Sequence, residues 1–68
     1  MTNWDSVLSN RKNVVTVRKF VEGDLSGREL YSSFANTQNG GEVRTLLRGG
    51  VDRARNLARK ALYRRDFV

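Results

Sequence analysis

Residues 42–65 of this 68-residue chain read EVRTLLRGGVDRARNLARKALYRR, the longest stretch of helical periodicity in it. When each residue advances by about 100° around a helix axis, the apolar and small side chains fall in one sector. These residues are Val43, Leu46, Leu47, Gly50, Ala54, Leu57, Ala58 and Ala61. The pattern predicts a long basic amphipathic helix over residues 42–65.

Basic side chains border the apolar sector on both sides. Arg44, Arg48, Arg55 and Arg59 fall on one flank, and Arg53, Lys60 and Arg64 fall on the other. Arginine binds phosphate and carboxylate groups through paired hydrogen bonds. We therefore expect these side chains to contact nucleic-acid phosphates or the acidic groups of a protein partner. The alternative is that they only keep a small protein soluble.

The centre of the apolar sector is made of small residues. Gly50, Ala54, Ala58 and Ala61, with Leu57 beside them, form a predicted helix-packing interface. Small side chains let another helix approach closely, either within the fold or between subunits. The alternative is that alanine is present only because it is the best helix former.

Gly49 and Gly50 interrupt the same stretch. A glycine inside a helix costs about 0.5–1 kcal/mol, so two in succession favour a broken or bent helix over a continuous one. In the broken form, residues 42–48 make a separate short helix, and Asp52 caps a helix over residues 53–65.

The first part of the chain predicts a short helix over residues 2–9, with Thr2 as its N-cap, and then a polar break over residues 10–13. Residues 14–22 are ambiguous, because β-branched side chains favour a strand while the spacing of the valines and Phe20 favours a helix. We expect a helix that ends at Gly23, where a C-cap belongs.

Ser26-Gly27-Arg28-Glu29 matches the capping box S-x-x-E and predicts a helix over residues 27–36. The preceding link is short, which predicts a helical hairpin over about 14–36. Residues 37–41 predict a glycine-rich hinge before the basic helix. The chain is therefore expected to form a single all-α domain over residues 1–68, with three or four helices.

Residues 17–31, VRKFVEGDLSGRELY, resemble the helix–Gly-Asp–helix hairpin that opens the core-binding region of bacterial sigma factors. The resemblance covers about a fifth of the chain. It is consistent with a hairpin at this position and assigns no role to any residue.

The composition disfavours catalysis. The chain has no Cys and no His, so it offers no thiolate, no imidazole base and no ordinary zinc site. We expect a protein that is not an enzyme and has no cofactor, metal or small-molecule substrate.

No apolar stretch is long enough to span a membrane, and the N-terminus lacks the features of a signal peptide. The expected location is the cytoplasm or a particle assembled inside the cell.

The net charge is +6, and residues 36–68 hold eight of the thirteen basic side chains. A core of this size supplies only about 3–5 kcal/mol, which favours self-association or a protein partner. Trp4 and Phe67, near the two ends, are candidate anchors on such a partner. We expect a structural or adaptor subunit of a larger assembly, such as a virus or phage particle or a ribonucleoprotein, docked through residues 42–65. The alternatives are a sequence-nonspecific nucleic-acid-binding protein and an inhibitor or regulator of a nucleic-acid enzyme.

Overall fold

The computed structural model describes residues 3–66, with side chains described for residues 3–64. This part of the chain contains helices and no strand, which confirms the all-α prediction, with five helices rather than three or four. In chain order they are α1 (Trp4–Leu8), α2 (Arg11–Glu22), α3 (Gly27–Phe34), α4 (Gly40–Leu47) and α5 (Val51–Asp66).

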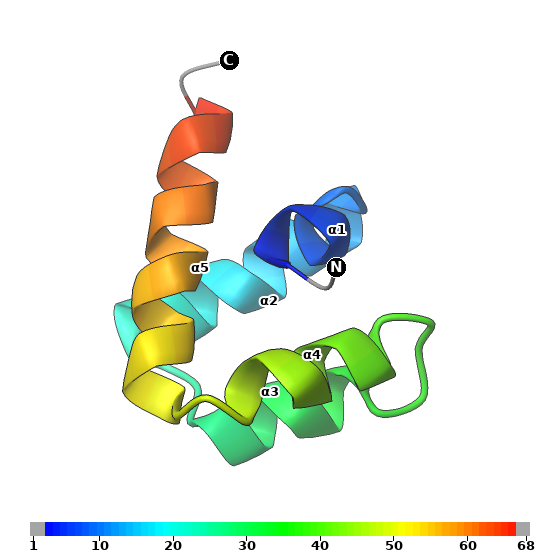
Figure 1. The fold of residues 1–68 in the computed structure, drawn as a ribbon. Coiled ribbons are helices and arrows are strands. Elements are labelled where there is room, and N and C mark those ends of the chain that lie inside the picture. The colour runs from blue at the N-terminus through cyan, green and yellow to red at the C-terminus, as the bar shows by residue number, and fades with distance from the viewer. Residues whose placement is uncertain (1–2, 67–68) are drawn as a thin grey trace.

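The helices pack around the contact between α2 and α5, which is the most extensive contact between two helices in the described residues. In Figure 1, α3 and α4 lie side by side at the bottom, and α5 rises from the end of α4 along one edge. The short helix α1 contacts α2, α4 and α5. The described chain measures 28 × 22 × 22 Å along its principal axes.

Phe20 of α2 lies at the centre of the core and is fully buried. The ring of Trp4 stacks on it, with 6.2 Å between the ring centroids and 30° between the planes. Aromatic pairs at this spacing contribute about 0.5–1.5 kcal/mol beyond the area they bury. Trp4 is only 4% exposed, so this candidate terminal anchor is a core residue of its own chain. Phe67 lies outside the described residues.

Two local signals between α2 and α3 are confirmed. Gly23 has φ +93°, and the N–H groups of Gly23 and Asp24 donate to the carbonyls of Phe20 and Lys19, respectively, at 3.2 and 2.9 Å. This pattern is a Schellman cap. At the start of α3, Ser26 and Glu29 form both hydrogen bonds of the capping box.

The starts of the first two helices differ from the prediction. The N-cap of α1 is Asn3, whose Oδ1 accepts from the Ser6 N–H at 3.0 Å; Thr2 lies outside the described residues. Residues 10–13 are no break, because Asn10 caps α2 by accepting from the Lys12 N–H. Asparagine caps helices as well as serine or aspartate does, so the polar run starts a helix.

Gly40 and Gly41 belong to the first turn of α4, so the predicted hinge over residues 37–41 is shorter than expected. A Cβ built on Gly40 would lie 2.6 Å from the Phe34 carbonyl oxygen. Glycine at this position therefore permits the close approach of α4 to the end of α3. A Cβ on Gly41 would meet nothing within 4 Å.

The basic stretch is broken at Gly49–Gly50, as favoured from the sequence. Gly50 has φ +110°, which a continuing helix cannot contain. Its carbonyl accepts from the Ala54 N–H at 3.0 Å, so α5 begins directly after it. Asp52 therefore lies inside the first turn of α5 and is not the predicted N-cap, although its charge still complements the helix dipole there.

The two glycines at the start of α4 give a matched pair of substitutions. Gly40→Ala forces a Cβ against a backbone carbonyl and should lower the free energy of unfolding by about 1–3 kcal/mol. Gly41→Ala should raise it by up to about 1 kcal/mol, because alanine is the better helix former and the site is open. Urea denaturation followed by circular dichroism measures both. Equal effects of the two substitutions would contradict the described packing of α3 and α4.

Candidate functional site

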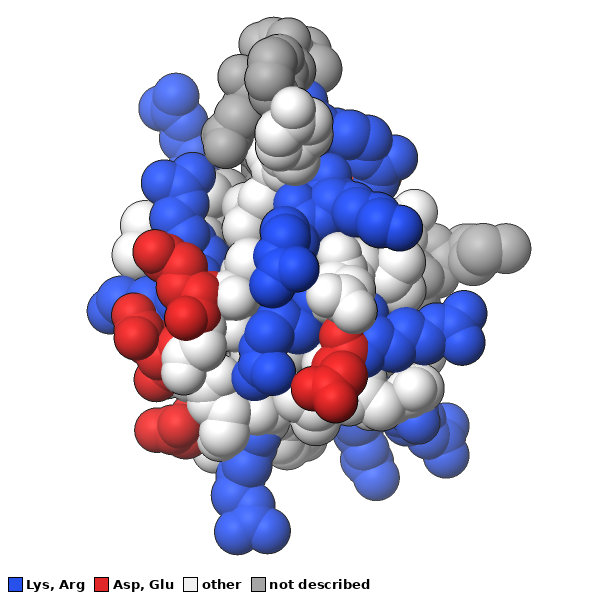
Figure 2. Space-filling model, turned by 90° about the vertical axis from the view of Figure 1, so that its left-hand side faces the viewer, with Lys and Arg blue, Asp and Glu red and all other residues white. Residues whose placement is uncertain are grey.

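The predicted cations are exposed on α4, on α5 and on the link between them, with one exception. Arg44, Arg48, Arg53, Arg59, Lys60 and Arg64 are exposed, and Arg55 is partly buried. Figure 2 shows Lys and Arg side chains forming a band along the face that α5 presents, with acidic side chains at one margin and another between basic side chains in the lower part of the face. Because the chain turns at Gly50, the predicted row from Arg44 to Arg59 is not the flank of one continuous helix.

Arg55 acts inside the fold. Its Nε–H donates to the Phe20 carbonyl at 2.9 Å, and its guanidinium carbon lies 4.8 Å from the centroid of the Phe20 ring. The side chain is 25% exposed, and it also forms a 3.6 Å ion pair with Asp52. Arg55 thus joins the C-terminal end of α2 to α5 by a hydrogen bond and a cation–π contact. The pair with Asp52 adds little, because that carboxylate is 99% exposed.

The predicted helix-packing interface is divided between the core and the surface. Ala54, Ala58 and Ala61 are buried and belong to the core cluster. Gly50 is exposed in the link before α5, and Leu57 is 42% exposed. The alanines therefore pack within this fold, and they are not available to another subunit. The helical wheel places Leu57 beside the small residues, and in α5 the buried face is formed by Ala54, Ala58, Ala61 and Leu62, so Leu57 lies at its edge.

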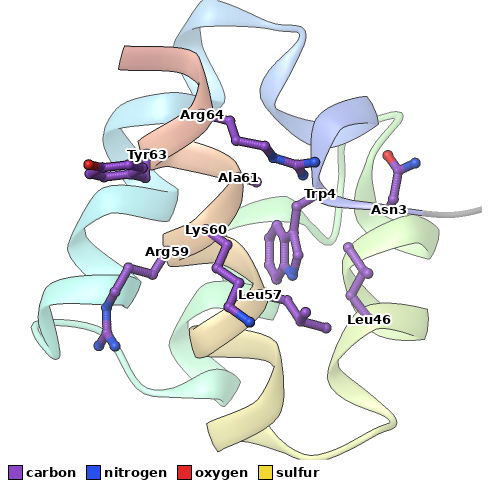
Figure 3. A pocket seen from close by; sticks show the side chains of 9 residues that line it. All are labelled: Asn3, Trp4, Leu46, Leu57, Arg59, Lys60, Ala61, Tyr63 and Arg64. Carbon is purple, nitrogen blue, oxygen red and sulfur yellow. The ribbon is translucent and has the colours of Figure 1, made fainter. Parts of the chain in front are cut away.

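A groove of about 700 Å³ lies between α5, the start of α1 and α4. Its lining includes apolar side chains of Trp4, Leu46, Leu57 and Ala61. Figure 3 shows the side chains of Leu57, Lys60 and Arg64 on the side of α5 that faces Trp4. Arg59 and Tyr63 also line the groove, and in this view their side chains extend away from Trp4. We call the surface formed by Trp4, Leu46, Leu57, Lys60, Ala61 and Arg64 the Trp4 groove.

The rim of the Trp4 groove is cationic. Lys60 forms no ion pair within the described part of the chain. Arg64 reaches from α5 to α1, where its Nη2 lies 3.4 Å from Oδ2 of Asp5. Both partners of this pair are more than half exposed. Within the described residues, the groove therefore combines an apolar floor with the ammonium group of Lys60, which has no acidic partner, and the guanidinium of Arg64, which already contacts a carboxylate.

The indole nitrogen of Trp4 is buried and donates to no acceptor in the part of the chain that the structure describes. Figure 3 places this nitrogen on the side of the ring toward Leu57. Nearly all buried donors in proteins have a partner, so an unsatisfied N–H at a groove is unusual. It is the one buried side-chain nitrogen or oxygen without a hydrogen bond among the described residues.

Asn13 is an organising residue that the sequence patterns missed. It is a buried polar side chain, and its Nδ2 donates to the Val7 carbonyl at 2.8 Å and to Asn39 Oδ1 at 2.9 Å. Asn39 in turn donates to Glu42 Oε1 at 2.7 Å. The network joins the end of α1, α2 and the start of α4. Leu62, at 7% exposure, was also missed, although it follows Ala58 by four residues on the same face.

The described residues contain no cluster of acidic, His or Cys side chains that could hold a metal ion. Within the same residues, no helix has both the length and the apolar character needed to cross a membrane. Comparisons with protein-family models, with curated proteins and with solved structures give no match for this chain. Inferences about function therefore rest on the basic surface and the Trp4 groove.

The role of Arg55 can be separated from that of its exposed neighbour Arg59. Arg55→Ala should lower the free energy of unfolding by about 1–3 kcal/mol, because it removes the hydrogen bond to Phe20 and the cation–π contact. Arg59→Ala should change it by less than about 0.5 kcal/mol. Urea denaturation of both variants is the measurement. An Arg55→Ala variant as stable as Arg59→Ala would show that Arg55 is only a surface cation.

Proposed function

We propose that this protein is a non-enzymatic docking module, a small structural or adaptor subunit that binds an acidic surface of a partner protein in a larger assembly. The observation that carries the proposal is the set of exposed cations on α4, α5 and the link between them that have no acidic partner in the described chain. They are Arg44, Arg48, Arg53, Arg59 and Lys60. Their mutual repulsion is relieved when an anionic partner binds.

Arginine chemistry favours this kind of contact. A guanidinium forms two parallel hydrogen bonds with a carboxylate, and it is more weakly hydrated than an ammonium group. Charges at the rim of an interface speed association and select the partner, while buried apolar contacts supply most of the affinity. The exposed part of α5 offers both, since Val51, Leu57 and Tyr63 are at least 40% exposed beside the cations.

Nucleic-acid binding is the second candidate, because the band of basic side chains in Figure 2 is suited to contacts with phosphates. Two observations favour a protein partner. The Asp52 carboxylate is almost fully exposed on α5, where it would repel a phosphate backbone. The apolar side chains of α5 would also have no counterpart on phosphates. An inhibitor or regulator of a nucleic-acid enzyme would use the same basic surface against acidic residues of its target.

Fluorescence anisotropy distinguishes these candidates with two labelled probes, a generic DNA duplex and an acidic amphipathic peptide. We expect the peptide to bind more tightly than the duplex at physiological salt. If about four cations contact phosphates, log K for the duplex should fall with log salt with a slope of roughly −3 to −4. Tighter binding of the duplex at physiological salt would contradict the adaptor proposal and support the nucleic-acid alternative.

A charge-matched pair of double variants identifies the surface. Arg48→Glu with Arg53→Glu should weaken peptide binding about tenfold, because both belong to the exposed cations proposed to contact the acidic partner. Arg11→Glu with Arg28→Glu changes the net charge equally in the nearly neutral half of the chain. This control should change the affinity less than about threefold. Equal losses in the two double variants would show that net charge alone drives binding.

A further inference from the structure

We infer that the Trp4 groove is the docking site for an acidic amphipathic helix of the partner protein. This inference rests on the proposed function, because it names the chemistry of the partner and the surface that receives it. The groove volume, about 700 Å³, lies within the range of about 300–1,000 Å³ that is usual for ligand sites. Its apolar floor and cationic rim match a helix that carries apolar side chains on one face and carboxylates beside them.

The apolar floor requires a partner with apolar side chains. Leu57 is 42% exposed, Leu46 is partly buried, and both lie beside the indole of Trp4. Side chains at positions i, i+3 and i+4 of a docked helix cover such a surface together. Burial of Leu46 and Leu57 then removes apolar area from water, which is the main source of affinity in interfaces of this kind.

The rim selects for negative charge. Arg64 already holds a carboxylate, that of Asp5, at 3.4 Å, while Lys60 has no acidic partner among the described residues. Both basic side chains are exposed, so a carboxylate of the partner can pair with Lys60 and compete with Asp5 for Arg64. A second copy of this chain is a poor occupant, because the net charge of +6 makes its surface repel the same rim.

The unsatisfied donor at the floor also points to a ligand. The Trp4 indole N–H lacks an acceptor in the described chain, and its nitrogen faces toward Leu57. Leu57 is exposed enough to change rotamer when a helix docks. A carboxylate or carbonyl oxygen of the partner then accepts from the indole N–H, and the donor becomes satisfied.

The chain has a single tryptophan, so one indole N–H resonance reports on the groove. The test titrates the ¹⁵N-labelled full chain with a peptide of about 18 residues, long enough to be helical, with leucines on one face and glutamates elsewhere. We expect the chemical shift of the indole N–H to change as peptide is added and to reach a plateau when the protein is saturated. A scrambled peptide of the same composition, which has no apolar face, should move it little.

Substitutions in the groove have matched controls outside it. Lys60→Glu should weaken peptide binding at least about fivefold and Leu57→Asp at least about tenfold. The controls are Lys12→Glu and Val15→Asp, exposed positions on α2 that do not line the groove, and they should change the affinity less than about twofold. Circular dichroism checks that each variant is folded. If Leu57→Asp unfolds the chain, the affinity of the Lys60→Glu variant tests the groove inference, because Lys60 is exposed.

Asp5→Asn should act in the opposite direction. It removes the carboxylate that competes for Arg64, so peptide binding should tighten by about two- to fivefold. A purely structural role of the Asp5–Arg64 pair would leave the affinity unchanged or lower it.

Each failure has its own signature. Peptide binding in the anisotropy assay with no movement of the indole resonance would overturn the groove inference and leave the proposed function standing. If the peptide does not bind at any salt concentration, both the groove inference and the proposed function are overturned. Movement of the indole resonance by the DNA duplex, abolished by Lys60→Glu, would assign the groove to nucleic acid instead. If the indole resonance moves with protein concentration in the absence of any peptide, the groove is assigned to a second copy of the chain.

Discussion

The close packing of α5 on α2 is the contact on which the rest of the structure depends. The buried face of α5 is made of Ala54, Ala58, Ala61 and Leu62, and the three small alanine side chains let the two helices approach. Phe20 fills the space beside them, with Trp4 stacked on its ring and the Arg55 guanidinium over it. One aromatic side chain thereby joins α1, α2 and α5 in a chain that has no disulfide to support its small core.

This packing leaves α5 with two surfaces of different chemistry. Its exposed cations form the band seen in Figure 2, and its apolar edge at Leu57 faces Trp4 across the groove in Figure 3. Charge of one sign gives rapid association and selects acidic partners, whereas the apolar groove supplies contact area and requires a matching shape. The proposed docking function uses both surfaces. It places the partner on the outside of α5, because the alanines inside are already covered.

The sequence predicted local features well and tertiary contacts poorly. Three predicted local features are found in the structure: the capping box at Ser26 and Glu29, the C-cap at Gly23 and the break at Gly49–Gly50. Each depends only on a few neighbouring residues. Asn13 and Arg55 bind groups that lie far away in the chain, and no spacing rule shows such partners.

The candidate docking surface was predicted in part. The exposure of Lys60 and most of the arginines follows from their place on the helical wheel, but the Trp4 groove needs residues from α1 and α4 that only the fold brings to α5. The proposed docking function depends most on α5 being formed in the free protein. Amide hydrogen exchange without any partner tests this directly: residues 54–61 should be protected to nearly the same degree as the middle of α2. Exchange of these amides at unprotected rates would contradict it, because α5 would then fold only on its partner.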